Sequence, residues 1–160
     1  MSWHYHFIPL LAKIMDIRDY LELGVYDGQN INEISQFVPN CVGVDTKIHS
    51  IKNPKFTFHQ ETTDEFFSYN TTFFDLIFID ACHDFENVKK DFDNSIERLR
   101  PNGVILIHDT CPVSEKDKES GYCSDAYKIK DYIKTHGDYA RWGESFTIES
   151  FPGLTMYRFI

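Results

Sequence analysis

Hydrophobic residues follow two patterns along this chain, short continuous runs and repeats at spacings of three and four. Continuous runs are typical of strands buried on both faces of a parallel sheet, whereas the repeats are typical of amphipathic helices. The runs, together with an alternating segment at 55–59, predict strands at residues 20–25, 41–45, 55–59, 73–80 and 104–109. The repeats predict helices at residues 3–15, 30–38, 61–67, 85–99 and 126–133. Two further strands are expected at 145–151 and 154–159.

Strands and helices alternate along the chain, which predicts a doubly wound parallel sheet with right-handed crossovers. Pro152 and Gly153 predict a turn, so that the sheet ends in an antiparallel β-hairpin. The expected fold class is therefore α/β, with a mostly parallel, seven-stranded, Rossmann-like sheet in one domain, residues 1–160. A turn is predicted at 101–103 before the fifth strand. Residues 110–124 show no periodicity, and a loop of this length is usually functional or mobile.

The composition narrows the classes of partner. The formal net charge is −9 and the pI is about 5.1. Proteins that bind a nucleic-acid backbone normally carry a basic surface, so the acidic balance disfavours nucleic acid. No apolar run approaches the roughly 20 residues that cross a bilayer, and the N-terminal residues predict no signal peptide. The four cysteines have no C-x-x-C spacing, which favours reduced thiols and a cytoplasmic location.

The strand at 20–25 leads into a glycine-containing turn and then a helix, which is the first half of a nucleotide-binding unit. Gly24 and Gly28 are separated by three residues, unlike the Gly-x-Gly-x-x-Gly pattern of dinucleotide-binding proteins. Glu22 and Asp27 flank the turn and would repel a pyrophosphate, but they suit a ligand with cationic groups. S-adenosylmethionine, with a sulfonium, an ammonium group and no phosphate, meets this description. A tight turn beside a capping acid is the structural alternative.

Two further segments are candidates for holding a nucleoside. Asp45 ends the second predicted strand, where an acid can accept hydrogen bonds from both ribose hydroxyls. Thr62 and Thr63 begin the helix after the third strand, where either can cap the helix or contact the edge of an adenine base. For Asp45 the structural alternative is a strand-end aspartate that faces solvent.

Polar residues also follow the fourth and fifth strands. Asp80 and His83 come after the fourth strand, and His108 and Asp109 end the fifth. If these strands are neighbours, the four side chains converge at one edge of the sheet. Asp80, His108 and Asp109 are candidate ligands of Mg²⁺ or Mn²⁺, although each residue alone could have a structural role. A zinc site is an alternative that matches no zinc spacing, with the ligands Cys82, His83, His108 and Cys111.

In these motifs the chain resembles the class I S-adenosylmethionine-dependent methyltransferases, and most closely the small O-methyltransferases of the metal-dependent type. The resemblance covers about residues 18–159 and rests on the order and spacing of Glu22-Leu-Gly24-Val-Tyr-Asp-Gly28, Asp80-Ala-Cys-His83, His108-Asp109 and Gly153-Leu-Thr-Met-Tyr157. Ala81 departs from the glycine of many relatives. The N-terminal segment is short, so the pocket is expected to stay open or to be completed by residues 110–124 or by a second copy of the chain.

The resemblance implies roles for single residues. It assigns the cofactor to Glu22, Gly24, Gly28, Asp45, Thr62, Thr63 and Asp80. In metal-dependent members, the positions of Asp80 and Asp109 hold the metal, and the position of His83 provides the base. A neutral imidazole near its ordinary pKa of about 6.5 is a competent base at neutral pH.

The predicted function is therefore the transfer of a methyl group from S-adenosylmethionine to a hydroxyl of a small molecule, such as a sugar or another polyol-like metabolite. The alternatives are a methyltransferase of the same fold that acts on nitrogen in a protein or nucleic acid, and a non-catalytic protein that binds S-adenosylmethionine. A nicotinamide oxidoreductase is a third alternative, which the acids around the first turn disfavour. Residues 80–83 lack the aromatic-proline motif of amino-methylating enzymes.

Overall fold

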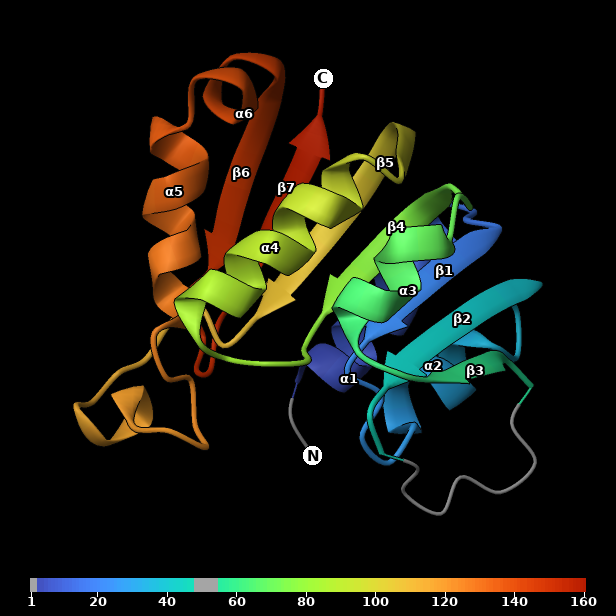
Figure 1. Cartoon of the computed structure of the whole chain (residues 1–160), viewed down its shortest axis with the longest axis horizontal. Coiled ribbons are helices and arrows are strands. Elements are labelled where there is room, and N and C mark those ends of the chain that lie inside the picture. The colour runs from blue at the N-terminus through green and yellow to red at the C-terminus, as the bar shows by residue number, and fades with distance from the viewer. Residues whose placement is uncertain (1–2, 48–54) are drawn as a thin grey trace.

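The computed structural model describes residues 3–47 and 55–160 and shows a seven-stranded sheet between two layers of helices (Figure 1). The strand order is β3-β2-β1-β4-β5-β7-β6. The strands are β1 (Asp19–Leu23), β2 (Asn40–Asp45), β3 (Thr57–Gln60), β4 (Phe74–Ile79), β5 (Leu99–His108), β6 (Gly143–Ile148) and β7 (Leu154–Phe159). Strands β1 to β5 are parallel, and β7 runs antiparallel to both β5 and β6. The predicted fold class is confirmed.

The helices cover both faces of the sheet. They are α1 (His4–Ile14), α2 (Gln29–Ile34), α3 (Thr63–Tyr69), α4 (Phe85–Ile96), α5 (Ile129–Thr135) and α6 (Gly137–Trp142), with short 3₁₀ helices η1 (Lys116–Lys118) and η2 (Ala126–Lys128). Helices α1 and α2 lie behind the sheet in Figure 1, whereas α3, α4 and α5 lie in front of it. Among the described helices, none is long and apolar enough to cross a membrane.

Each face of the sheet has its own hydrophobic core, because the central strands carry apolar side chains on both faces. Ile77 and Ile105 pack with α3, α4 and α5, whereas Leu76 and Leu106 pack with α1 and α2. All four side chains are fully buried, and each such burial contributes about 1.5–3 kcal/mol. Burial on both faces explains why β4 and β5 appear in the sequence as almost continuous apolar runs.

The turn predicted at 101–103 is wrong, since these residues lie inside β5. The strand begins at Leu99, which pairs with Phe74, and the pairing then shifts so that Leu76 lies opposite Val104. Asn102 takes a left-handed φ of 65° at this irregularity. Residues with turn-forming tendencies therefore make a bulged section of the strand.

Other element boundaries also differ from the predictions. The helices predicted to reach Val38 and Leu99 end earlier, at Ile34 and Ile96, although the two outer residues are still buried. The helical spacing of their side chains therefore continues after the backbone has left the helix. The first hairpin strand is shifted to 143–148, and α6, which has no fully buried residue, was not predicted.

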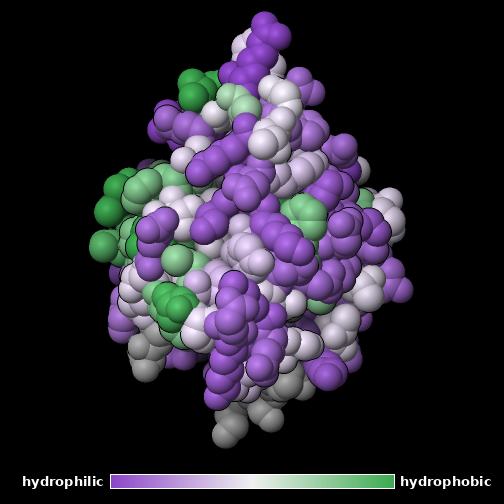
Figure 2. All heavy atoms as spheres, turned by 90° about the vertical axis from the view of Figure 1, so that its left-hand side faces the viewer, coloured by the Kyte–Doolittle hydropathy of each residue, from purple (hydrophilic) through white to green (hydrophobic). Residues whose placement is uncertain are grey.

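Residues 110–124 form a long connection that contains only η1, as the missing periodicity predicts. This connection and α5 lie on the left of Figure 1. Figure 2 shows that this face is mostly hydrophilic, with hydrophobic residues in separate groups. This agrees with a chain that carries a formal net charge of −9.

The carboxyl ends of β1, β2, β4 and β5 lie at the same edge of the sheet (Figure 1). Left-handed backbone conformations gather in the loops there, with φ values of 86° at Gly24, 49° at Tyr26, 73° at Gly28 and 58° at Asp109. A Cβ atom at Gly24 would lie 2.2 Å from the carbonyl oxygen of Asp80, so only glycine lets these two loops approach. Strained non-glycine residues are typical of functional sites, and this edge is where a ligand is expected.

Candidate active site

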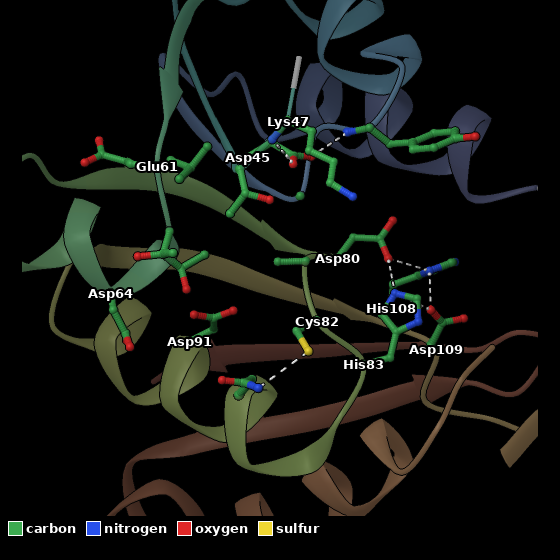
Figure 3. A pocket seen from close by; sticks show the side chains of 18 of the residues that line it. Asp45, Lys47, Glu61, Asp64, Asp80, Cys82, His83, Asp91, His108 and Asp109 are labelled. Carbon is green, nitrogen blue, oxygen red and sulfur yellow. Dashed lines mark hydrogen bonds and ion pairs between the residues drawn. The ribbon is translucent and has the colours of Figure 1, made fainter. Parts of the chain in front are cut away.

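A cavity of about 650 Å³ opens at this edge of the sheet (Figure 3). Most of the residues that the sequence assigns to the site lie in its wall, namely Gly24, Asp45, Thr62, Thr63, Asp80, His83, His108 and Asp109. The volume is within the range of small-molecule sites. The topology therefore brings the predicted motifs into one cavity, although they are far apart in the sequence.

Asp45 ties two loops of the cavity wall together. One carboxylate oxygen accepts hydrogen bonds from the backbone N–H groups of Val25 and Tyr26, each at 2.9 Å. The other oxygen accepts from the backbone N–H of Lys47 at 3.0 Å. Each carboxylate oxygen has more than one acceptor site, so these bonds leave capacity for a ligand hydroxyl. The role of Asp45 at a ribose stays a prediction.

Thr62 caps α3, which is one of the two roles predicted for it. Its hydroxyl oxygen accepts a bond from the backbone N–H of Glu65 at 3.2 Å and donates to the Glu65 carboxylate at 2.8 Å. The same carboxylate accepts from the backbone N–H of Thr62, which completes a capping box. Thr63 hydrogen-bonds to Asp91 instead. Contact of either threonine with adenine stays a prediction.

Glu22 lies behind the cavity wall and is only 2% exposed. One of its carboxylate oxygens accepts bonds from the Tyr20 hydroxyl at 2.5 Å and from the Asn30 amide at 2.6 Å. Burial raises the pKa of Glu22 to about 8, although these two bonds act in the opposite direction. Gly28, the N-cap of α2, also lies outside the wall. The acid of the first motif therefore joins β1 to α2, and its contact with a cofactor stays a prediction.

Replacing Glu22 with glutamine should remove a pH-dependent cost to folding. The native pKa of about 8 lies above the ordinary value of 4.5, so between these pH values the folded protein keeps a proton that the unfolded chain loses. The contribution of Glu22 to stability is therefore present below pH 4.5 and is lost as pH rises to about 8. Relative to the wild type, Glu22→Gln should gain up to about 1.4 kcal/mol per pH unit in this window.

Denaturant unfolding of both proteins at pH 5 and pH 8 measures this gain. The difference in unfolding free energy between the two proteins isolates Glu22 from other titrating groups. An equal difference at both pH values would show that the carboxyl group titrates normally.

Asp80, His83, His108 and Asp109 converge as predicted, because β4 and β5 are neighbours in the sheet (Figure 3). The His108 Nδ1 atom lies 2.9 Å from the Asp80 carboxylate and 3.3 Å from that of Asp109. The His83 Nε2 atom lies 3.1 Å from the Asp109 carboxylate and 3.5 Å from that of Asp80. Two acids and two imidazoles therefore form one cluster at this end of the cavity.

The cluster shifts the pKa of each imidazole upward. Hydrogen bonding to Asp80 raises the pKa of His83 to about 9, against the effect of burial. Burial alone would lower the pKa of His108, but Asp80 and Asp109 raise it to about 10. Burial would likewise raise the pKa of Asp80, but His108 and His83 hold it well below its usual range. The expectation of a pKa near 6.5 for His83 is therefore wrong for this arrangement of charges.

The orientation of the His83 ring follows from one backbone contact. Its Nδ1 atom lies against the carbonyl oxygen of Tyr122 in the connection 110–124. Because a carbonyl can only accept, Nδ1 carries the proton and the lone pair of the neutral ring lies on Nε2. Nε2 faces Asp80 and Asp109, so the basic nitrogen points to the same place as the two carboxylates.

Two groups of side chains in the described ranges have the geometry of metal ligands. One consists of Asp80, His83 and Asp109, and the other of His4, Asp80 and His108. Carboxylate oxygens with one imidazole suit Mn²⁺, and the carboxylates alone with water suit Mg²⁺. Neither group includes a cysteine, so the zinc alternative with Cys82 and Cys111 gains no support.

His108 belongs to the metal-competent group that contains Asp80 and His4, and not to the group that contains Asp109. Its Nε2 atom lies 2.9 Å from the Nδ1 atom of His4, while its Nδ1 atom faces Asp80. Both ring nitrogens are therefore engaged by side chains, and His83 is the imidazole grouped with Asp80 and Asp109. The assignment of His108 as a ligand stays a prediction.

Sequence reasoning missed several residues of the site, among them His4, Tyr5 and Asp91. His4 and Tyr5 come from α1, where Tyr5 lines the cavity and His4 supports His108. Their predicted role was only to pack a helix on the sheet, and no spacing links them to residues about 100 positions away. Asp91 also lines the cavity, and a signal for it existed, because this acid lies beside Val88 and Phe92 on the apolar face of α4.

Residues 21–110, more than half of the chain, match the model of a family described as a methyltransferase domain. The chain belongs to this methyltransferase family. The match contains all of the motifs up to His108-Asp109 on which the resemblance rests. The methyltransferase part of the prediction is confirmed.

Two solved structures illustrate the likeness of this methyltransferase to known folds. An O-methyltransferase from Bacillus cereus, in complex with S-adenosylhomocysteine, is 18% identical, with a TM-score of 0.73 over 100% of this chain and 82% of that chain. The O-methyltransferase TomG from Streptomyces achromogenes, involved in tomaymycin synthesis and in complex with S-adenosylmethionine, is 15% identical, with a TM-score of 0.76 over 99% of this chain and 80% of that chain. At such identities the likeness shows the fold.

One curated relative matches over a short segment. It is the uncharacterized protein y4gI of Sinorhizobium fredii (strain NBRC 101917 / NGR234), which is 47% identical over 36 residues. The match covers 22% of this chain and only 4% of the length of that relative. This segment adds nothing to the assignment of activity.

Proposed function

We propose that this methyltransferase transfers a methyl group from S-adenosylmethionine to a hydroxyl of a small molecule, of the sugar or polyol type. The observation that carries the proposal is the position of the Nε2 atom of His83, which the Tyr122 carbonyl holds inside the cavity at 3.1 Å from Asp109. This arrangement can take a proton from an acceptor hydroxyl held beside the carboxylates. The two similar structures are named O-methyltransferases and contain S-adenosylmethionine or its product, which supports the choice of cofactor and acceptor.

The cavity suits S-adenosylmethionine in size and in chemistry. Its volume of about 650 Å³ is sufficient for a nucleoside joined to an amino acid. The wall at Gly24 has no side chain, and Asp45 lies at the end of β2, where a ribose is expected. The acids around the cavity favour a cofactor that carries positive charge, and they disfavour the pyrophosphate of a nicotinamide cofactor.

The reaction is an in-line displacement at the methyl carbon. The acceptor oxygen forms a bond to that carbon as the carbon–sulfur bond breaks, and the sulfur keeps the electron pair, which leaves S-adenosylhomocysteine. The proton of the acceptor hydroxyl passes to Nε2 of His83, whose ring is held by the carbonyl of Tyr122. Most of the remaining rate enhancement comes from holding the two reactants in line.

Asp80 and Asp109 are the residues that would hold a divalent cation in this reaction. Such a cation, when bound, polarises the acceptor oxygen and lowers the pKa of its hydroxyl. Its positive charge would also oppose the effect of the two carboxylates on His83, so the pKa of that imidazole would fall below about 9. The mechanism requires a neutral His83, and the lower pKa increases the neutral fraction of the imidazole at physiological pH.

Production of S-adenosylhomocysteine in a panel of acceptors tests the proposal. Sugars and polyols should be methylated, with Mg²⁺ or Mn²⁺ present, and matched amines and peptides should not. Methylation of the amines alone would favour the nitrogen-methylating alternative. Cofactor binding without turnover of any acceptor would favour a non-catalytic binding protein.

Replacing Asp45 with alanine should weaken the binding of S-adenosylhomocysteine by about 1.5–3 kcal/mol, the range for hydrogen bonds to a charged group. The loss has two sources, the ribose bonds themselves and the backbone bonds that hold the loop after β1. Titration calorimetry measures it. Glu33→Ala is the matched control, because Glu33 is exposed on α2 outside the cavity wall and its loss changes the charge equally. Unchanged affinity in folded Asp45→Ala would remove the ribose assignment.

A further inference from the structure

Asp91 is a buried acid whose presence in the cavity wall has no explanation in the packing of α4. Its neighbours on the helix face, Val88 and Phe92, are apolar and belong to the core. Asp91 is 2% exposed and yet lines the cavity. Figure 3 shows its side chain on the opposite side of the cavity from His108 and Asp109. A buried carboxylate costs free energy unless it accepts hydrogen bonds.

The protein itself provides limited compensation for this carboxylate. Burial raises the pKa of Asp91 to about 6, while a hydrogen bond from the Thr63 side chain acts in the opposite direction. The nearby cation Lys90 is engaged with Asp64. At pH 7 Asp91 is therefore mostly ionised, and its oxygens can accept further hydrogen bonds from a ligand.

Two fixed points define which part of the cofactor would reach Asp91. The reactive methyl group must lie near Nε2 of His83, and the ribose is expected at Asp45. The base, on the far side of the ribose from the sulfonium, then falls in the part of the cavity lined by residues 61–64 and Asp91.

Within that part of the wall, the neighbouring hydroxyl groups are already engaged. The hydroxyl of Thr62 both donates and accepts in the capping box, and Thr63 bonds to Asp91. Asp64 lies half exposed and is paired with Lys90. Asp91 is thus the buried acceptor that the wall presents to a base.

We propose that Asp91 accepts a hydrogen bond from the exocyclic amine of the adenine base and so makes the cofactor site specific for an amino group at that position. This inference rests on the proposed function, because it assumes that the ligand is S-adenosylmethionine. A keto group at the same position would place its oxygen against the carboxylate oxygen of Asp91. Neither of these two oxygens could donate a hydrogen bond to the other. Sites built to pair one polar group reject analogues that lack it, because their own buried group is then left unpaired.

Binding of two ligands that differ at this position, and by a proton on the adjacent ring nitrogen N1, tests the proposal. S-adenosylhomocysteine carries the amine, and its deaminated analogue S-inosylhomocysteine carries a keto group. Wild-type protein should bind S-adenosylhomocysteine about 10- to 100-fold more tightly by titration calorimetry, in line with the loss of a bond to a charged group. In Asp91→Asn this preference should disappear, so that the two ligands bind about equally well, because the asparagine amide can donate a hydrogen bond to the keto oxygen.

Glu86→Gln is the matched control, since it removes the same charge from the same helix, α4, outside the cavity wall. Glu86 is exposed, so this variant should keep the wild-type preference. Loss of the preference in Glu86→Gln with retention in Asp91→Asn would overturn the assignment.

If Asp91→Asn does not fold, the affinities of the wild type for the two ligands still test the proposal. Equal binding of the two ligands by the wild type would overturn the role of Asp91 and leave the proposed function intact. Failure of the wild type to bind S-adenosylhomocysteine at all would overturn both. The two failures are therefore distinguishable in one titration series.

Discussion

Replacing His83 with alanine should lower the rate of methyl transfer by about 10²–10⁴-fold, the typical contribution of a general base. The ring is held by Tyr122 so that Nε2 faces Asp80 and Asp109, whereas the two ring nitrogens of His108 contact Asp80 and His4. Single-turnover measurements with saturating cofactor report this rate. Affinity for S-adenosylhomocysteine should barely change, because Nε2 faces the acceptor end of the cavity.

His83→Gln separates proton transfer from hydrogen bonding. The amide can still donate to Tyr122, but it cannot take a proton, so the rate should stay low. His6→Ala is the matched control, because it removes an exposed imidazole from α1. Wild-type turnover in a folded His83→Ala protein would sink the assignment. A lower melting temperature with an unchanged rate would instead show that His83 stabilises the loop next to Asp84.

The pH dependence gives a second measure of the same residue. His83 acts as a base only when it is neutral, and its pKa is about 9 in this arrangement of charges. With a divalent cation present, turnover of the wild type should therefore rise with pH and level off below this value. The rise of turnover with pH that is due to His83 should be missing from the pH–rate profile of His83→Ala.

The fold could be predicted because its strongest signals are local. Val88 and Phe92 repeat at helical spacing, and Ile77 and Ile105 lie in runs that only a strand buried on both faces explains. The bulge in β5 could not be predicted, since residues 101–103 favour a turn and only pairing with β4 makes them part of a strand. Tertiary pairing overrides local propensity there.

The convergence of residues at the ends of β4 and β5 was predictable, and the geometry of the cavity wall less so. Asp80 and Asp109 converge because neighbouring parallel strands end at one edge, a rule that needs no side-chain detail. Whether Glu22 lies in the cavity wall or behind it depends on the rotation of β1, which decides that its carboxylate meets Tyr20 and Asn30. The bond from His108 to His4 spans a separation of 104 residues and leaves no trace in local spacing.

Chelation of divalent cations should abolish methyl transfer, and Mg²⁺ or Mn²⁺ should restore it. Asp80 and Asp109 place two carboxylates within reach of one ion, and a bound cation lowers the pKa of the acceptor hydroxyl. A contribution of several kcal/mol corresponds to at least about 10³-fold in rate. Binding of S-adenosylhomocysteine should survive chelation, because the proposed contacts to the nucleoside come from residues around Asp45 and Asp91.

Asp109→Asn provides the decisive comparison, because it removes one charge from the cluster without changing the size of the side chain. It should weaken the binding of Mn²⁺, measured by electron paramagnetic resonance of the free ion, and lower the rate together with it. Asp84→Asn is the matched control, since asparagine still caps α4 and Asp84 lies outside both metal-competent groups. Full activity in excess chelator, with no Mn²⁺ bound by the wild type, would leave Asp80 and Asp109 as residues that orient His83 and the acceptor without a metal.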